Sequence, residues 1–281
     1  KVTEVSDSGS VPELQFLNEG DLPVLLLDGE ELVGAKQNRV LNLSILAPAH
    51  KNIKIPVSCV EQGRWSHSTS DFHMEDRVMF SRGRSNKAAS VSRSMASGGS
   101  RRSDQSEVWE NISAKSARFD VASPTGSMSD IFEDRKQSIE EFVGAFNSIN
   151  CQVGAIFGID GAVGGIDLFD APDTFAKLMP KLVRSYSLDA IETPTEEKKK
   201  TTEIEAKRFI EVLSTIQTQE FPAVGLGKDL RLESEMISGG ALVNEGRVVH
   251  LGAFPLITEN STGRSPRRSC MMRSSQRRRA H

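Results

Sequence analysis

The chain of 281 residues has few cysteines and none of the short motifs that identify common enzyme classes. Its three cysteines, Cys59, Cys151 and Cys270, lie far apart and include no CxxC pair. This spacing argues against a zinc ribbon or a disulfide framework and favours a reducing, cytosolic compartment. The sequence also contains no Walker-type GxxxxGKS or GxxxxGKT, no HExxH, no GxSxG and no GxGxxG placed before a helix. P-loop, zincin, α/β-hydrolase and dinucleotide sites are therefore not indicated.

Long apolar runs are also missing. No stretch approaches the roughly 18 consecutive apolar residues that a membrane-spanning helix needs. The first residue is Lys1, and no basic segment followed by an apolar one is present, so no signal peptide is expected. With 37% apolar residues, the chain is expected to bury the core of one large domain or of two small ones.

The body of the chain is acidic on balance, whereas its tail is basic. The formal net charge is −3, and Ser261–His281 contains seven arginines and no acidic residue. Without these seven positive charges, residues 1–260 carry −10. An acidic body disfavours nucleic acid as a partner, and the composition indicates no membrane partner. The tail, residues 258–281, has no apolar periodicity and is predicted to be disordered.

The residue pattern changes from β to helical and back to β along the chain. Short apolar or alternating runs in the first third predict strands, with a loop over the first part of Glu31–Asn42. Helical spacing dominates the middle, where Ser123-Pro124 has the order of an N-cap followed by a first helical residue. The strands are expected at Val2–Val5, Leu14–Leu17, Pro23–Leu27, Val40–Leu46 and Ile53–Val60, and the helices around Asn86–Ala96, within Asp104–Phe119, after Ser123, and over Asp173–Ile191 and Ile204–Ile216.

A hairpin is the clearest local prediction. Two apolar runs in Gln152–Phe169 flank Asp160-Gly161, the dipeptide best suited to a two-residue turn, and nearby glycines indicate a bulge. Further strands are expected at Val224–Leu226, Leu230–Ile237, Gly240–Val243 and Arg247–Phe254. We therefore predict one α+β domain over residues 1–257. Its N- and C-terminal β segments form a mixed or antiparallel sheet layer that the middle helices cover.

Unusual polar chemistry is concentrated in Leu25–Trp65, beside two strand-like runs. So many different donors and acceptors beside strands indicate either a ligand site or a structural ion-pair network. The candidates for ligand binding are Asp28, Glu31, Lys36, Gln37, Asn38, Arg39, Gln62, Arg64 and Trp65, and the candidates for catalysis are Glu30, Glu61 and Cys59.

Each of these candidates also has a structural explanation. Crowding of Asp28, Glu30 and Glu31 favours a raised carboxyl pKa and general-acid use, but Lys36, Arg39 and Arg64 are equally suited to neutralise them. A nearby cation would activate Cys59, yet a free cysteine in a strand is more often a small buried hydrophobe. His67 and His73 have no accompanying third ligand, so no metal site is expected.

Several segments resemble the ARPP-1 family of bacterial and archaeal proteins. They are LLLDGEELVGAKQNRVLN (Leu25–Asn42), IPVSCVEQGRW (Ile55–Trp65), RRSDQSEVW (Arg101–Trp109), VGGIDLFD (Val163–Asp170) and KLVRSYSLDAI (Lys181–Ile191). The resemblance runs from about Val2 to Phe254 and implies association with ADP-ribosylglycohydrolase and rhodanese-phosphatase proteins. It assigns no catalytic residues. Family members usually have a further β region before the part that matches Lys1–Val11, so the resemblance implies that this chain is truncated.

Three functions remain open from the sequence. The first is a cytosolic ligand-binding or accessory module with a polar cleft formed by LDGEELVGAKQNR and CVEQGRW, which takes a small anionic ligand. The second is an enzyme acting on a phosphorylated, nucleotide or ADP-ribose-type substrate, with Glu30 or Glu61 as acid or base and Arg39 or Arg64 as anion clamp. The third is interaction through the basic segments, with binding that weakens steeply with salt. The sequence indicates no cofactor.

Overall fold

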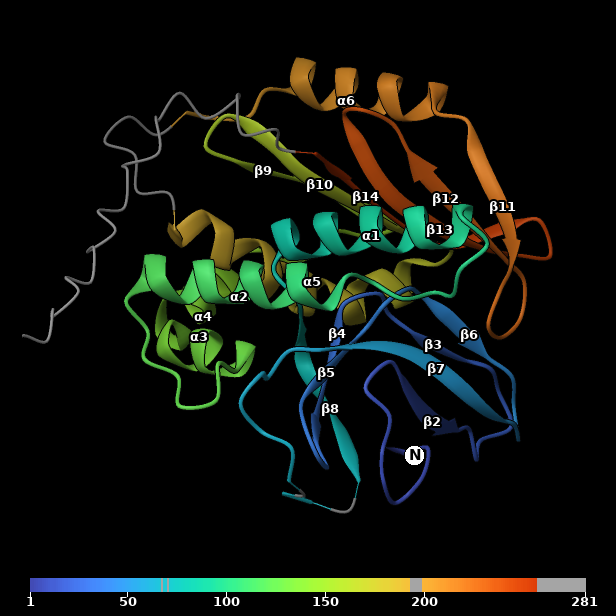
Figure 1. Cartoon of the computed structure of the whole chain (residues 1–281). Coiled ribbons are helices and arrows are strands. Elements are labelled where there is room, and N and C mark those ends of the chain that lie inside the picture. The colour runs from blue at the N-terminus through green and yellow to red at the C-terminus, as the bar shows by residue number, and fades with distance from the viewer. Residues whose placement is uncertain (67, 70, 193–198, 257–281) are drawn as a thin grey trace, which may run out of the picture.

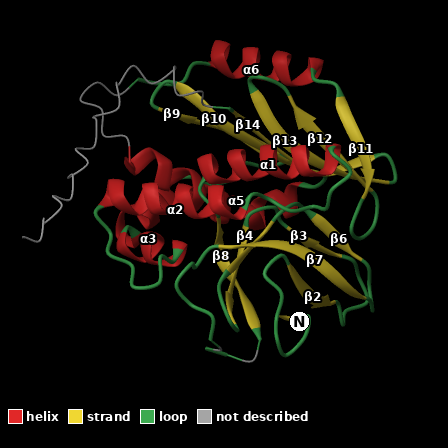
Figure 2. Cartoon of the chain, viewed as in Figure 1, coloured by secondary structure: helices red, strands yellow, loops and turns green. Residues whose placement is uncertain are grey.

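A computed structural model describes residues 1–66, 68–69, 71–192 and 199–256, and it has a β-barrel at the N-terminal end and an antiparallel sheet at the C-terminal end (Figure 1). Helices lie between these two β units, as the secondary-structure colours in Figure 2 show. The predicted α+β class is confirmed. Over the described residues, no helix is both long and apolar enough to cross a membrane.

The barrel is built from six strands. In order around the barrel they are β1 (Val2–Glu4), β2 (Glu13–Leu17), β7 (Asn52–Cys59), β5 (Arg39–Leu41), β4 (Glu30–Gly34) and β8 (Phe72–Val78). The pairing of Val2 with Phe72 closes it. Because side chains alternate along a strand, every second residue points inward, and those residues form an apolar interior that includes Val2, Leu14, Phe16, Leu32, Leu41, Ile55 and Val57. A two-stranded ribbon, β3 (Val24–Leu26) and β6 (Ile45–Ala47), lies beside the barrel.

The C-terminal sheet is entirely antiparallel. Its strand order is β11 (Thr218–Pro222), β12 (Lys228–Glu233), β13 (Ile237–Asn244), β14 (Arg247–Pro255), β10 (Ala162–Phe169) and β9 (Gly154–Ile159). The predicted hairpin is confirmed: β9 and β10 meet at Asp160 and Gly161, whose φ angles are +48° and +80°. The expected bulge lies between Val163 and Gly165.

Helices cover both faces of this sheet. The inner face packs on α1 (Ser81–Ala96) and α5 (Pro172–Glu192), which also separate the sheet from the barrel (Figure 1). The outer face packs on α6 (Glu203–Thr215), whose Phe209 joins Ile237 and Ala253 of the sheet in one apolar cluster. The other helices are α2 (Gln105–Phe119), α3 (Met128–Asp134) and α4 (Lys136–Ala145). The two β segments therefore form separate units with helices between them, whereas we expected one layer.

Three local predictions were wrong. The helix expected after Ser123 begins at Met128, because Ser127 provides the N-cap and Ser123 Oγ instead accepts a hydrogen bond from the Ser127 N–H (2.8 Å). A loop was expected over the first part of Glu31–Asn42, but strand β4 (Glu30–Gly34) occupies most of it. The chain leaves β4 in a turn to β5, where Gly34 and Ala35 have φ of +132° and +38°. Strand β8 was not expected because its sequence, FHMEDRV, is largely polar.

The C-terminal strand predictions were partly accurate. The strand expected over Leu230–Ile237 ends at Glu233, and β11 (Thr218–Pro222) was not expected. Val224–Leu226 is not a strand, and Leu226 forms only a single bridge to Leu46. The tail prediction, for residues 258–281, lies outside the described residues, as does His67.

Candidate functional site

The two motif segments form one structural unit, as predicted. Strands β5 and β7 pair antiparallel, with Arg39 directly opposite Cys59 and Val40 opposite Ser58. Leu41 and Val57 lie in the barrel interior, so the alternation of side chains turns Arg39 and Cys59 inward as well. Both are completely buried. The interior therefore changes from apolar to polar at the end of the barrel where β5 begins and β7 ends.

The acidic cluster does not stay together. Asp28 forms an ion pair with Lys87 of α1, Glu30 with Lys181 of α5, and Glu31 with Arg77 of β8. Adjacent residues of a strand point to opposite faces, which sends Glu30 and Glu31 to different neighbours. The carboxylates are thus neutralised by cations other than Lys36, Arg39 and Arg64, and the ion pairs that we predicted among the motif residues are wrong for all three acids.

Within this cluster, Glu31 is completely buried. Burial raises the pKa of the Glu31 carboxyl, and the adjoining Arg77 opposes that effect only in part. Its two oxygens are already occupied, one by Arg77 Nε (2.5 Å) and the other by Ser129 Oγ (2.8 Å). Burial is the largest cause of the raised pKa of Glu31, and the nearby charge of Glu75 adds a smaller effect in the same direction.

Glu61 and Arg64 form a hydrogen-bonded pair at the rim of the barrel end. Arg64 donates to Glu61 from Nε (2.9 Å) and Nη2 (2.7 Å), and the Asn38 N–H and Thr125 Oγ1 donate to the same carboxylate (3.1 and 3.0 Å). Burial raises the pKa of Glu61, but these hydrogen bonds and the charge of Arg64 outweigh burial and lower it. Glu61 is therefore an ionised structural acceptor in this arrangement, which does not suit it to act as an acid.

Arg39 lacks such complete pairing. Its Nη1 donates to Gln37 Oε1 (3.0 Å) and to the Asn38 carbonyl (3.3 Å). Its Nε and Nη2 are buried and have no hydrogen-bond partner in the part of the chain that the structure describes. Burial lowers the pKa of the Arg39 guanidinium, because no carboxylate in contact compensates for the lost hydration.

Trp65 and Lys36 cover Arg39. The Trp65 ring lies 5.6 Å from the Arg39 guanidinium carbon and 5.5 Å from Lys36 Nζ, within the range of cation–π attraction. Trp65 is 48% exposed, while Lys36 Nζ donates to the Asp7 carbonyl (2.5 Å). The polar cleft that we expected is therefore closed here, and Trp65 separates the buried guanidinium from solvent.

Cys59 lies on the inner side of the same group. Its thiol donates to Gln37 Oε1 (3.1 Å) or to the Glu61 carbonyl (3.2 Å), and burial raises its pKa. A protonated thiol is a poor nucleophile, so the structural explanation of Cys59 is the better supported one. The remaining candidate, Gln62, is exposed.

The structure adds Glu4 to this group. Both of its carboxylate oxygens are buried, and neither has a hydrogen-bond partner among the described residues. Glu4 follows Val2 by two positions in β1, so it points into the barrel as Val2 does. From the sequence, Glu4 could have been identified only by this alternation of side chains, and only after β1 had been recognised as a barrel strand. We call Glu4, Lys36, Arg39, Cys59 and Trp65 the barrel-end cluster.

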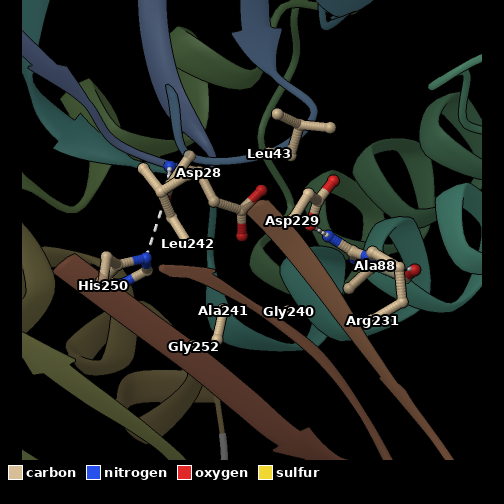
Figure 3. A pocket seen from close by; sticks show the side chains of 11 residues that line it. Asp28, Leu43, Ala88, Asp229, Arg231, Gly240, Ala241, Leu242, His250 and Gly252 are labelled. Atoms are coloured by element: carbon tan, nitrogen blue, oxygen red, sulfur yellow. Dashed lines mark hydrogen bonds and ion pairs between the residues drawn. The ribbon is translucent and has the colours of Figure 1, made fainter. Parts of the chain in front are cut away.

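A second buried polar group lies between the barrel and the sheet. Figure 3 shows Asp28 of the barrel side facing Asp229, Arg231 and His250 of the sheet across a cavity. The cavity has a volume of about 10 Å³, which is room for about one water molecule. It is too small for a substrate. One oxygen of Asp229 is buried without a hydrogen-bond partner among the described residues and is suited to bind that water.

Ser44, His250 and Asp167 form a chain of hydrogen bonds in the order Ser–His–Asp that is found in catalytic triads. Ser44 Oγ lies 2.8 Å from His250 Nδ1, and His250 Nε2 lies 3.1 Å from Asp167 Oδ1. Because Asp167 accepts from Nε2, we infer that Nδ1 accepts the Ser44 proton. However, the Asp28 N–H donates to the same Ser44 oxygen (2.9 Å), and no space for an acyl group lies beside it.

Asp167 is the centre of this second group. It accepts two hydrogen bonds from Arg84 (2.7 and 3.0 Å) and one from the Tyr186 hydroxyl (3.0 Å). Burial opposes ionisation, but Arg84 and His250 outweigh it and lower the pKa of Asp167 to about 2. Gly252 lies opposite Asp167 in the sheet, and a side chain there would come within 3.3 Å of Arg84 Nη2. We call Asp28, Arg84, Lys87, Asp167 and His250 the interface network.

Sequence reasoning missed most of the interface network. Asp167 and His250 each stand within apolar strand runs, which was the available signal for buried charge. Arg84 and Lys87 belong to a Ser- and Arg-rich stretch, and residues of these types are mostly exposed in folded proteins. No group of three or more metal-ligating side chains occurs within the described residues.

Comparison with known proteins places the chain in a family. Neither the curated proteins nor the solved structures contain a match to it. A family model described as the ARG and Rhodanese-Phosphatase-superfamily-associated Protein domain, ARPP-1, matches residues 1–254, and the chain therefore belongs to the ARPP-1 family.

Proposed function

We propose that this chain is a ligand-binding or accessory module that takes a small anionic ligand at the barrel-end cluster. The observation that carries the proposal is the state of Arg39, which is completely buried while its Nε and Nη2 have no partner among the described residues. A buried donor without an acceptor costs about 1–3 kcal/mol. An anion bound at these nitrogens would remove that cost.

The free atoms of Arg39 have the right arrangement for such a ligand. Nε and Nη2 lie on one edge of the guanidinium and present two parallel N–H groups, the fork that pairs with a carboxylate or phosphate. The other edge is held in place, since Nη1 is fixed by Gln37 and the Asn38 carbonyl. A positioned guanidinium with one open edge is suited to bind an anion without rearranging first.

Access to Arg39 involves Trp65. The ring is half-exposed and lies over both Arg39 and Lys36, so a ligand must displace it or slide beneath it. Binding would therefore change the environment of Trp65, one of only two tryptophans in the chain.

The test is a screen of the full chain by thermal shift and tryptophan fluorescence with phosphate, sulfate, small carboxylates, phosphosugars, nucleotides and ADP-ribose. We expect at least one small anion to raise Tm and alter fluorescence in the wild type and to lose both effects in Arg39→Met. The matched control is Lys54→Met, which removes an exposed cation from the barrel strand β7. An identical response from Arg39→Met and the wild type, or no response to any anion, would refute the proposal.

A further inference from the structure

Glu4 determines a second property of the ligand. Both carboxylate oxygens of Glu4 are buried and unpartnered within the described part of the chain, as are two nitrogens of Arg39. The charge of Glu4 is close enough to raise the pKa of Arg39 against the effect of burial. Yet the two side chains form no hydrogen bond with each other. Two opposite charges in one barrel interior therefore remain apart, each with open hydrogen-bonding atoms.

Lys36 does not satisfy Glu4 either. A side chain at Gly9 would contact both residues, with Lys36 Cδ at 3.1 Å and Glu4 Oε2 at 3.3 Å, so Lys36 and Glu4 lie beside the same point of the loop. The Lys36 amino group nevertheless turns to the Asp7 carbonyl and the Trp65 ring. Glu4 is left with two acceptors and has no cationic partner in contact among the residues that the structure describes.

These contacts also limit the size of the ligand. The loop that contains Gly9 packs against Glu4. Gly9 has φ of +75°, and a methyl group at Gly9 would be in tight contact with Glu4 Oε2 at 3.3 Å. The Trp65 ring covers Arg39, and the rest of the barrel interior that Arg39 and Glu4 enter is apolar. A ligand between them must be small and must present groups of opposite character.

We propose that the barrel-end cluster binds a small zwitterion of the amino-acid type. Its anionic group accepts from Nε and Nη2 of Arg39, and its ammonium group donates to Glu4. This inference rests on the proposed function and goes further by naming the ligand class. A charged hydrogen bond to each end satisfies every open atom of the two side chains, which a simple anion does not.

The experiment compares matched probes on the full chain. The zwitterions are glycine, alanine, serine, β-alanine and taurine. Each is compared with the same molecule without its amino group, such as acetate or propionate, and with the same molecule without its anionic group. We expect at least one zwitterion to bind about tenfold or more tightly than its carboxylate analogue, the gain typical of a hydrogen bond to a buried charge. Calorimetric titration measures the two dissociation constants, with Tm as a second readout.

Glu4→Gln tests which residue produces the preference. This variant keeps the shape of the side chain but removes its charge, so the preference for the zwitterion should fall to about twofold or less, because only the charged contact is lost. Binding of the carboxylate analogue, which depends on Arg39, should persist. Glu13→Gln, on the neighbouring strand β2, is the matched control and should keep the preference.

The outcomes separate the two proposals. If a carboxylate binds through Arg39 and the zwitterion binds no better, the ligand class is wrong while the anion site stands. If neither a zwitterion nor any anion binds, both proposals are wrong. Should Glu4→Gln fail to fold, the comparison of probes on the wild type still decides, since a wild type without preference overturns the inference by itself.

Discussion

The barrel-end cluster and the interface network both contain buried charge, but they differ in how completely that charge is paired. In the interface network, Asp167 receives hydrogen bonds from Arg84, Tyr186 and His250. In the barrel-end cluster, Arg39 and Glu4 are buried together with four polar atoms that have no partner within the described chain. Within the described chain, one atom of the interface network, Arg84 Nε, also has no hydrogen-bond partner, but it lies 3.5 Å from Asp28 Oδ2 and is paired by charge. A network in which nearly every polar atom is paired indicates a structural role, whereas several open atoms in a rigid frame indicate a ligand. Both groups are buried, so burial of charge alone does not distinguish a site from scaffold.

The largest effect should come from breaking the interface network. Arg84→Met removes the two hydrogen bonds that hold Asp167 and leaves a buried carboxylate, so we expect a loss of about 3–5 kcal/mol in the free energy of unfolding. Urea denaturation measures it. The double variant Arg84→Met with Asp167→Leu should lose less than Arg84→Met alone, because the stranded charge is gone. A loss below about 1 kcal/mol in the single variant would contradict a structural role for the network.

Acid should act on the same network. The folded pKa of Asp167, about 2, lies below the ordinary value of 3.8, so ionised Asp167 stabilises the fold above about pH 4. This contribution is lost progressively as the pH falls from about 4 to about 2, where the folded protein also begins to bind the proton. Denaturation curves recorded across that range should show a shallower pH dependence for Asp167→Asn. An unchanged slope in that variant would mean that other carboxylates account for the acid sensitivity.

Arg39→Met should have a small effect on stability, which sharpens the contrast with Arg84. The change gives up the hydrogen bonds to Gln37 and to the Asn38 carbonyl but also removes two buried donors that have no partner among the described residues, so the net effect should stay within about 1 kcal/mol. The same substitution at Arg84 and at Arg39 thus compares a paired with a partly unpaired buried arginine. Equal losses at the two positions would show that Arg39 is scaffold too.

The smallest effect is expected for the Arg-rich tail. Because Ser261–His281 has no apolar periodicity, deleting it should leave Tm within about two degrees of the full chain. Differential scanning calorimetry of both proteins at one ionic strength is the measurement. A larger drop would mean that the tail packs against the domain.

Local features of the fold were readable from the sequence. The Asp160-Gly161 turn, the apolar stripe of α5 and the alternating strands of the C-terminal sheet each follow from residues adjacent along the chain. These signals depend on backbone preference and periodicity, which a short segment expresses by itself. For the same reason β8 was missed, because its register is determined by partners in β4 and β1 rather than by its own polar sequence.

For the candidate site, the sequence by itself determined that the Leu25–Trp65 stretch is dense in polar chemistry and that its two segments are neighbours. Only the tertiary structure decided which charges meet. Glu30 and Glu31 are adjacent in sequence but contact Lys181 and Arg77, because a strand turns successive side chains to opposite faces. Glu4 joins Arg39 from a distant strand because closure of the barrel gives both the same interior. Pairing of charges is a property of packed surfaces, and it is therefore decided by contacts between segments far apart in the chain.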